Sequence, residues 1–197
     1  MLERSIFDDE IEIVLHVIDN NATVPNPVIK SDITVIYQCN IENKPNESIF
    51  EYANKYLTEY DFFINIDDDI VFSSHDIQKL LDVDNKYYAS SYAYDLVKSN
   101  FGNIPKTGEC ELCLLGFSKI PIAVYKDISW IDKESLKLTD MLLSYSCSRY
   151  LSVKMYGIKT ETVKQEGMQN VAIARTGILV EDRAKAKKKY IEFKNDQ

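Results

Sequence analysis

Three consecutive carboxylates, Asp67, Asp68 and Asp69, directly follow an apolar run at residues 61–66. Adjacent carboxylates repel one another, and a solvated turn needs only one Asp beside Gly or Asn. A divalent cation would relieve that repulsion. Because alternate residues of an extended segment point the same way, Asp67 and Asp69 can share one face. Such oxygen ligands suit Mg²⁺ or Mn²⁺, which complete their shells with water and phosphate oxygens. The triplet therefore predicts a metal site; the alternative is a polar strand end that caps the next helix.

The elements that must position this triplet alternate between strands and helices. Several runs are continuously apolar, which is typical of strands covered on both faces. In chain order we expect strands at 11–18 and 33–38, a helix introduced by a capping box of Ser48 and Glu51, a strand at 61–66, a helix from Ser73 or Ser74, strands at 87–94 and 111–117 flanking a loop at 96–108, and a helix from Asp140 that stops at Gly157. This order predicts an α/β chain with an open, mixed, mostly parallel sheet and helices on both faces. In such sheets ligands bind outside the carboxyl ends of strands, where the triplet lies.

The composition limits the classes of protein to consider. With 197 residues and 45% hydrophobic content, the chain can bury an ordinary core as one domain. Its formal net charge of −8, spread along the sequence, disfavours a nucleic-acid partner. No apolar run approaches the ~20 residues of a transmembrane segment, and the beginning, MLERSIFDDE, lacks a signal pattern. We therefore expect a cytoplasmic protein.

The sequence supports cysteine chemistry less strongly than it supports a metal site at the acidic triplet. The four cysteines are Cys39, Cys110, Cys113 and Cys147. Cys110 and Cys113 have the spacing of half a zinc site, but no second pair follows at a matching interval. A redox dithiol is the other alternative. Because Leu112, Leu114 and Leu115 indicate a buried strand, we expect buried, reduced thiols.

The stretch from Ser48 to Leu81 resembles the DXD region of GT-A-fold glycosyltransferases. In that family a helix feeds a strand that ends in acidic residues, as DFFINIDDD does at residues 61–69. The resemblance implies that Asp69, together with Asp67, binds Mn²⁺ or Mg²⁺ that grips the donor diphosphate. It also implies that Asp67 lies near the ribose or sugar and that Asp68 contacts the sugar or supports the site.

Three further segments extend the resemblance. Residues 139–157 are similar to the family's downstream segment, where an acidic residue opens a helix and is the catalytic base of inverting members; this makes Asp140 the candidate base. The alternative is that Asp140, or Thr139 beside it, only caps the helix. Gly116 resembles a family glycine that leaves room for donor and acceptor. Val17 and Asp19 lie where the family places its nucleobase pocket.

The resemblance covers residues 11–157 and implies one GT-A-like (Rossmann-like) domain over 1–197. Within it, about 11–95 would bind the nucleotide sugar, about 96–160 would hold the acceptor and the base, and 161–197 would be a C-terminal extension. The implied activity is metal-dependent transfer of a sugar from a nucleotide diphosphate donor, with a UDP-sugar favoured, to a hydroxyl of a glycan or other acceptor, with inversion. The late His ligand of many members is absent, and Lys159, Lys164 or Arg175 could meet the diphosphate instead.

Two other functions remain open from the sequence. The string from Asp67 to Val71 also fits the D-x-D-x-[TV] motif of haloacid-dehalogenase-type phosphatases, in which Asp67 and Asp69 would be nucleophile and acid/base with Mg²⁺. A non-catalytic nucleotide-sugar-binding module is the other alternative. Candidates for stacking against an acceptor sugar are Tyr92, Tyr94, Phe101 and Trp130, although core packing explains them equally well.

Overall fold

The computed structural model describes residues 14–19, 34–39, 53–56, 58–67, 69–97, 100–101, 106–125, 139–165 and 188. The chain divides into two compact units, residues 1–52 and 53–197. In the first unit, strand β1 (Val14–Asp19) pairs in parallel with strand β2 (Thr34–Cys39), with Val14 opposite Thr34 and Asp19 opposite Cys39. Strands therefore form in both of the first two apolar runs, as the sequence predicts.

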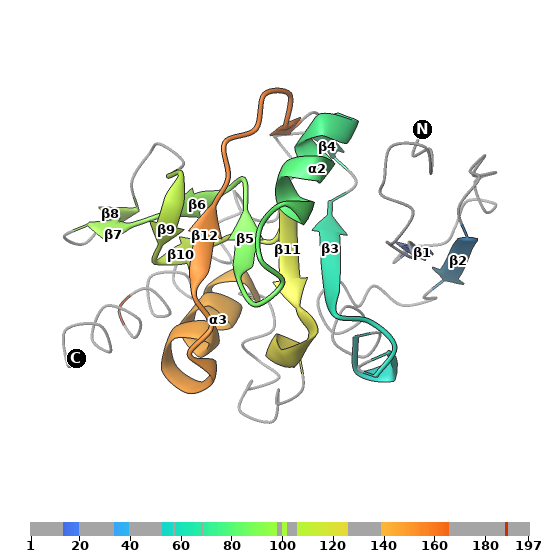
Figure 1. Ribbon diagram of the computed structural model, residues 1–197, viewed down its shortest axis with the longest axis horizontal. Helices are drawn as coiled ribbons and strands as arrows, with labels where there is room; N and C mark the ends of the chain where they lie inside the picture. Colours follow the sequence, from blue (N-terminus) through green and yellow to red (C-terminus); the bar gives the residue numbers. More distant parts are fainter. Residues whose placement is uncertain are drawn as a thin grey trace. The chain divides into compact units, whose positions relative to one another are not determined.

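The second unit contains a five-stranded sheet with the order β3-β11-β5-β12-β9 (Figure 1). Its described elements are β3 Phe62–Ile66, β4 Ile70–Val71, α2 Ser74–Leu81, β5 Tyr88–Ser90, β6 Ala93–Tyr94, β7 Leu96–Val97, β8 Asn100–Phe101, β9 Gly108–Cys110, β10 Leu112–Cys113, β11 Phe117–Pro121, the 3-10 helix η2 Ile122–Tyr125, α3 Thr139–Ser146, the π-helical segment η4 Cys147–Leu151, β12 Met155–Gly157 and β13 Lys164–Gln165. Helix α2 packs over β11, and α3 packs against β10.

The direction of the strands differs from the prediction. The mixed α/β class is confirmed, but the expected mostly parallel arrangement is wrong for this sheet: β11 runs antiparallel to both β3 and β5, and β12 runs antiparallel to β9. Only the pairing of β12 with β5 is parallel in the described sheet. Every residue of β11 is buried. A buried strand has a continuous apolar pattern whichever way it runs, so this pattern cannot give the strand direction.

Several element boundaries also differ from those expected. The run at 87–94 splits into β5 and β6, and the run at 111–117 splits into β10 and the start of β11. The expected loop at 96–108 contains the antiparallel pair of β7 and β8. The capping box of Ser48 and Glu51 lies outside the described residues.

The helical segment that includes Asp140 ends before Gly157. Ser152 has a left-handed backbone with a φ of 51°, and its N–H donates to Cys147 O. A left-handed residue closes a helix, because its backbone turns away from the helical path. Gly157, which we expected to be the helix stop, instead lies in β12, where its backbone passes very close to that of Lys106.

Gly157→Ala is expected to destabilise the protein strongly. An added Cβ would lie 1.9 Å from Lys106 O and 2.8 Å from Ala93 Cβ, so backbone would have to move. We expect the free energy of unfolding to fall by about 2 kcal/mol or more in urea titrations. Gly116→Ala is the control, because its new Cβ would find its nearest neighbour at 3.4 Å, an ordinary contact, and should cost much less. Equal losses in the two variants would contradict the close approach at Gly157.

Helix α2 begins at the predicted place and holds a later segment of the chain. Ser73 and Asp76 form a reciprocal capping box, and Asp76 is buried. Asp76 Oδ1 accepts from Glu161 N at 3.0 Å, and Asp76 Oδ2 accepts from Thr162 Oγ1. Burial raises the pKa of Asp76, but the hydrogen bonds from Thr162, Glu161 and Ser73 outweigh burial and leave it well below its usual range. The ionised Asp76 therefore ties residues 161–162 to the start of α2.

The other end of α2 is capped by a buried lysine on β11. Lys119 Nζ donates to Leu81 O at 3.2 Å and to Val83 O, and it lies 4.7 Å from the ring centroid of Phe62. Carbonyls at the end of a helix lack backbone partners, so the ammonium satisfies them. Burial lowers the pKa of Lys119 to about 8, although the charges of Asp84 and Asp82 partly oppose this effect.

Stability should rise with pH because of Lys119. Its folded-state pKa is about 8 and the usual lysine value is about 10.4, so the unfolded chain binds more protons between these two pH values. Relative to Lys119→Met, the wild-type free energy of unfolding should increase by about 2 kcal/mol from pH 7 to 10. Urea titrations across this range measure the difference. Lys55→Met, which changes an exposed lysine, should keep the wild-type slope. Parallel curves for the wild type and Lys119→Met would contradict the prediction.

Candidate functional site

The first carboxylate of the triplet lies at the carboxyl end of β3 in a hydrogen-bonded turn. Asp67 N donates to Gly116 O at 2.9 Å, and Ile70 N donates to Asp67 O at 3.1 Å. The Asp67 side chain is exposed. Asn65 Nδ2 donates to Asp67 Oδ1 and to Leu115 O, each at 3.2 Å. The carboxylate is thus oriented from β3 while one side of it remains open to solvent.

The phenol of Tyr92 is influenced by the charges of both Asp67 and Asp69. Burial raises the pKa of Tyr92, and Tyr94, Asp69 and Asp67 raise it further. The raised pKa keeps the Tyr92 phenol protonated, so that it can donate a hydrogen bond. Asp69 is half-buried in the turn before β4. Tyr92 is held in place by its own backbone, since Tyr92 N donates to Ser90 Oγ at 3.0 Å and Tyr92 O accepts from Leu114 N at 2.9 Å.

Gly116 forms one wall of this site. A Cβ on Gly116 would lie 3.4 Å from Asp67 Oδ2 and 3.6 Å from the Tyr92 ring. Any side chain longer than a methyl group would therefore enter the space beside the carboxylate. The structure thus brings Asp67 together with Gly116 and Tyr92, which the sequence analysis singled out separately.

Strand β13 brings a lysine to the segment that follows Asp69. β13 pairs antiparallel with β4, with Lys164 opposite Val71 and Gln165 opposite Ile70. Residues directly opposite in an antiparallel pair point to the same face. Because Asp76 fixes residues 161–162, the start of α2 and the segment leading to β13 are held together beside the triplet. Of the three cations considered for a diphosphate, Lys164 is the one whose backbone is placed next to the acidic turn; Arg175 lies outside the described residues.

The described structure does not place the other predicted site residues relative to this site. Asp68 lies outside the described residues. Asp140 is the second residue of α3, in its first turn, but its side chain is not described. Val17 is half-buried in β1, and Asp19 ends β1, both in the first unit. Their roles stay predictions.

The chain has few recognisable relatives among known proteins. No protein-family model and no curated protein matches the chain. Several solved structures are similar to this chain. Among them is the crystal structure of A197 from STIV, with 17% identity, a TM-score of 0.46, and coverage of 77% of this chain and 82% of that chain. A likeness at this level carries no information on activity.

The sequence analysis missed one residue of the site. Asn65 orients Asp67, and its signal was present: it is a polar residue inside the apolar strand, two positions before Asp67 and therefore on the same face. Tyr92 was noted only as a possible stacking residue. Its closeness to the carboxylates depends on the turn after β5, which the continuous run at 87–94 does not reveal.

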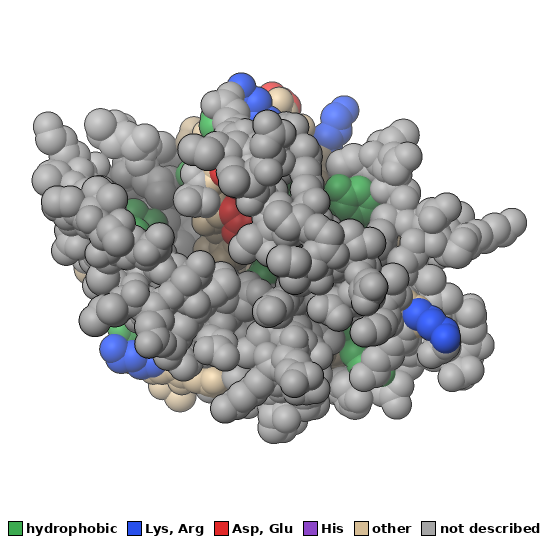
Figure 2. Space-filling view, turned by 180° about the vertical axis from the view of Figure 1, so that it is seen from behind, with side chains coloured by type: hydrophobic (Ala, Val, Ile, Leu, Met, Phe, Trp, Pro, Cys, Tyr) green, Lys and Arg blue, Asp and Glu red, His purple; other side chains and the backbone are tan. Residues whose placement is uncertain are grey.

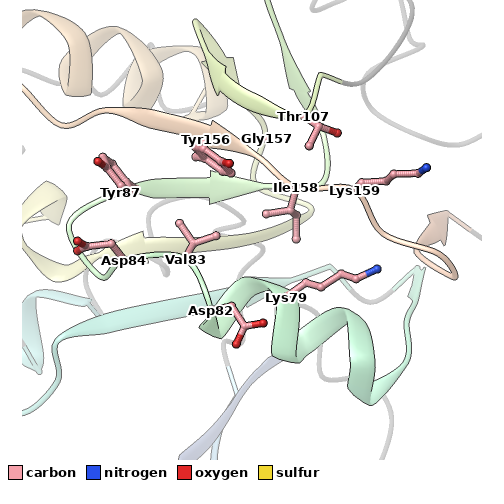
Figure 3. Close-up of a pocket in the computed structure, with 10 residues that line it drawn as sticks. All are labelled: Lys79, Asp82, Val83, Asp84, Tyr87, Thr107, Tyr156, Gly157, Ile158 and Lys159. Carbon is pink, nitrogen blue, oxygen red and sulfur yellow. The ribbon is translucent and has the colours of Figure 1, made fainter.

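A separate pocket of about 490 Å³ lies between the end of α2 and the strands β5 and β12 (Figure 3). It is lined by Lys79, Asp82, Val83, Asp84, Tyr87, Thr107, Tyr156, Gly157, Ile158 and Lys159. The rings of Tyr87 and Tyr156 stack at 6.3 Å in its wall. In Figure 3 the side chains of Lys79 and Lys159 extend toward the same side. None of its lining residues belongs to the acidic triplet, so Lys159 lines a pocket other than the acidic site.

Charged side chains of both signs reach the surface on the side opposite to the view in Figure 1. Figure 2 shows described acidic and basic side chains there in several separate places.

Among the residues that the structure describes, no group of three or more His, Cys, Asp or Glu side chains is arranged to hold a metal ion. A cation at Asp67 and Asp69 therefore stays a prediction. No helix within the described ranges is long and apolar enough to cross a membrane.

Proposed function

We propose that the protein is a metal-dependent glycosyltransferase that moves a sugar from a nucleotide diphosphate, with UDP favoured, to a hydroxyl of a glycan or other acceptor. One observation carries the proposal: the acidic triplet directly follows a sheet strand, and the Asp67 carboxylate lies beside Gly116 and the Tyr92 ring, where the glycine leaves space. Within this proposal the chain is a variant of the GT-A fold, and Asp140 is the base of an inverting reaction.

The residues at the site fit a bound Mn²⁺ or Mg²⁺. Asp67 is exposed and Asp69 half-exposed, so carboxylate oxygens are accessible from solvent. These cations often bind through one or two carboxylates and complete their shells with water and substrate phosphates. Two protein carboxylates are therefore sufficient. When bound there, the cation supplies charge stabilisation for the departing diphosphate.

The chain's own groups account for the remaining requirements of the reaction. Asn65 keeps Asp67 in one orientation, so the carboxylate does not have to reorganise when donor binds. The Tyr92 hydroxyl is a donor beside the two acids, suited to an oxygen of the sugar or phosphate. Gly116 leaves room for the sugar ring. Asp140 removes the proton of the acceptor hydroxyl as the bond to the donor breaks, and the sugar carbon passes through an oxocarbenium-like state.

A thermal-shift panel of nucleotide sugars, with and without Mn²⁺, tests the proposal. A ligand at a hundredfold excess over its Kd adds ~2.7 kcal/mol to the stability of the folded state. We expect a UDP-sugar with Mn²⁺ to raise the Tm, and each component alone to have a smaller effect. Stabilisation by phosphate monoesters with Mg²⁺ and not by nucleotide sugars would favour the phosphatase instead. Donor binding without consumption, across a panel of hydroxyl acceptors, would identify a binding module.

A further inference from the structure

We infer that Cys110 and Cys113 form a redox site, in which the two thiols are reversibly joined as an intramolecular disulfide by exchange with a low-molecular-weight disulfide. Their Sγ atoms lie 3.5 Å apart, in hydrogen-bond contact. A disulfide needs about 2.05 Å, so the sulfurs have to approach by about 1.5 Å. Both residues are free cysteines in the structure. This site is independent of the proposed transferase activity.

The backbone holds the two cysteines close together. Cys110 ends β9 and Cys113 ends β10, with Glu111 as the turn residue between the strands. Glu111 N donates to Tyr94 O at 3.1 Å, which fixes this turn. Cys113 is anchored from α3, because Cys113 N donates to Ser144 Oγ at 3.1 Å and Ser144 Oγ donates to Cys113 O at 2.9 Å. Closing the disulfide therefore requires side-chain rotation and a small adjustment of one turn.

The two sulfurs differ in their access to solvent. Cys113 is fully buried, whereas Cys110 is partly exposed. Burial raises the pKa of the Cys113 thiol well above its usual range, and its hydrogen bond with Cys110 raises it further. A disulfide from solution therefore reacts first at Cys110. The resolving thiol, Cys113, is protected from solvent and lies next to it.

The exchange balances in two steps. The Cys110 thiolate attacks one sulfur of the external disulfide R–S–S–R; a mixed disulfide forms, and R–S⁻ leaves and takes a proton from water. The sulfur of Cys113 then attacks Cys110 Sγ and expels the second R–S⁻, which takes the Cys113 proton and leaves as R–SH. The protein loses two hydrogens and two electrons, and R–S–S–R is reduced to two R–SH. Excess R–SH reverses the reaction.

Alkylation after equilibration in glutathione buffers tests this site. The full chain is incubated at increasing ratios of oxidised to reduced glutathione, quenched with acid, alkylated and digested with trypsin. Cleavage after Lys106 and Lys119 places both cysteines in the peptide 107–119. We expect this peptide to become lighter by two hydrogens and to lose both alkylation sites, and to regain them with excess reduced glutathione.

Two variants and the wild-type peptide serve as controls. Cys110→Ser should prevent the loss of two hydrogens, whereas Cys147→Ala, which changes a buried cysteine in η4, should leave the reaction unchanged. The wild-type peptide gives a result even if Cys110→Ser does not fold. The inference is overturned if both cysteines in 107–119 stay alkylatable at every ratio, or if glutathione remains attached to Cys110. A disulfide that joins Cys110 or Cys113 to another cysteine would overturn it as well.

Discussion

Asp69→Asn is expected to remove Mn²⁺-dependent binding of the nucleotide sugar and to lower its turnover by at least about a hundredfold. The change keeps the size of the side chain but removes its negative charge. Asp67 would then be the remaining carboxylate of the proposed pair, and the cation would lose half of the negative charge of that pair. Isothermal titration of donor in the presence of Mn²⁺ measures the loss, and initial rates of donor consumption measure turnover.

Asp61→Asn is the matched control for this prediction. Asp61 is exposed and precedes β3, so it lies at the opposite end of the strand that leads to the triplet. The same chemical change there alters the net charge by the same amount but leaves the site intact. We expect wild-type binding of Mn²⁺ and donor in Asp61→Asn. Equal loss in the two variants would indicate a general charge effect, and unchanged binding in Asp69→Asn would overturn the metal role of Asp69.

The position of the acidic site could be predicted from the sequence because its signals are local. A continuous apolar run before three acids predicts a strand that ends at the triplet, and β3 ends at Ile66 as expected. The cap of α2 is also local, since Ser73 and Asp76 are three residues apart. Both predictions depend on residues that are neighbours in the chain, where propensity and hydrogen bonding act directly.

The rest of the site depends on contacts between distant segments, which have no local signal. Gly116 meets Asp67 because β11 pairs antiparallel with β3, and the residues themselves give no direction for β11. Lys119 is a further example. A lysine in an apolar run suggests an exposed edge, yet it is buried because the carbonyls of Leu81 and Val83 lie over it. The capping role of Lys119 depends on the contact between the end of α2 and strand β11, which no local sequence pattern indicates.

The dependence on contacts between distant segments also explains why the predicted end of the α3 segment, at Gly157, is wrong. A glycine after a helical stripe is a normal stop signal, but a serine can adopt the left-handed conformation at a modest energetic cost. Ser152 does so here, and Gly157 is needed for a different reason, namely the close approach of Lys106 O. A stop signal therefore indicates that a helix ends near a position, and tertiary packing selects the residue.

Asp140→Asn is expected to lower turnover by about 10²- to 10⁴-fold while donor binding and stability stay close to wild type. General-base catalysis requires a group that accepts a proton, and the Asn amide does not. The capping alternative predicts something else. Asp140 is the second residue of α3 and lies past the N-cap position, so its alternative role is to stabilise the positive end of the helix dipole. Asn loses this charge at a cost of about 0.3–1 kcal/mol but keeps the size of the side chain.

The Asn variant therefore separates the two roles of Asp140, which an Ala variant would remove together. Full turnover in Asp140→Asn would leave only the interaction of Asp140 with the helix dipole. A large loss of turnover with an unchanged donor Kd would support the base, because the lost interaction is one made in the transition state. The anomeric configuration of the product, read by NMR, adds an independent criterion. Inversion requires a base on the acceptor side, whereas retention would exclude this role for Asp140 whatever the rates show.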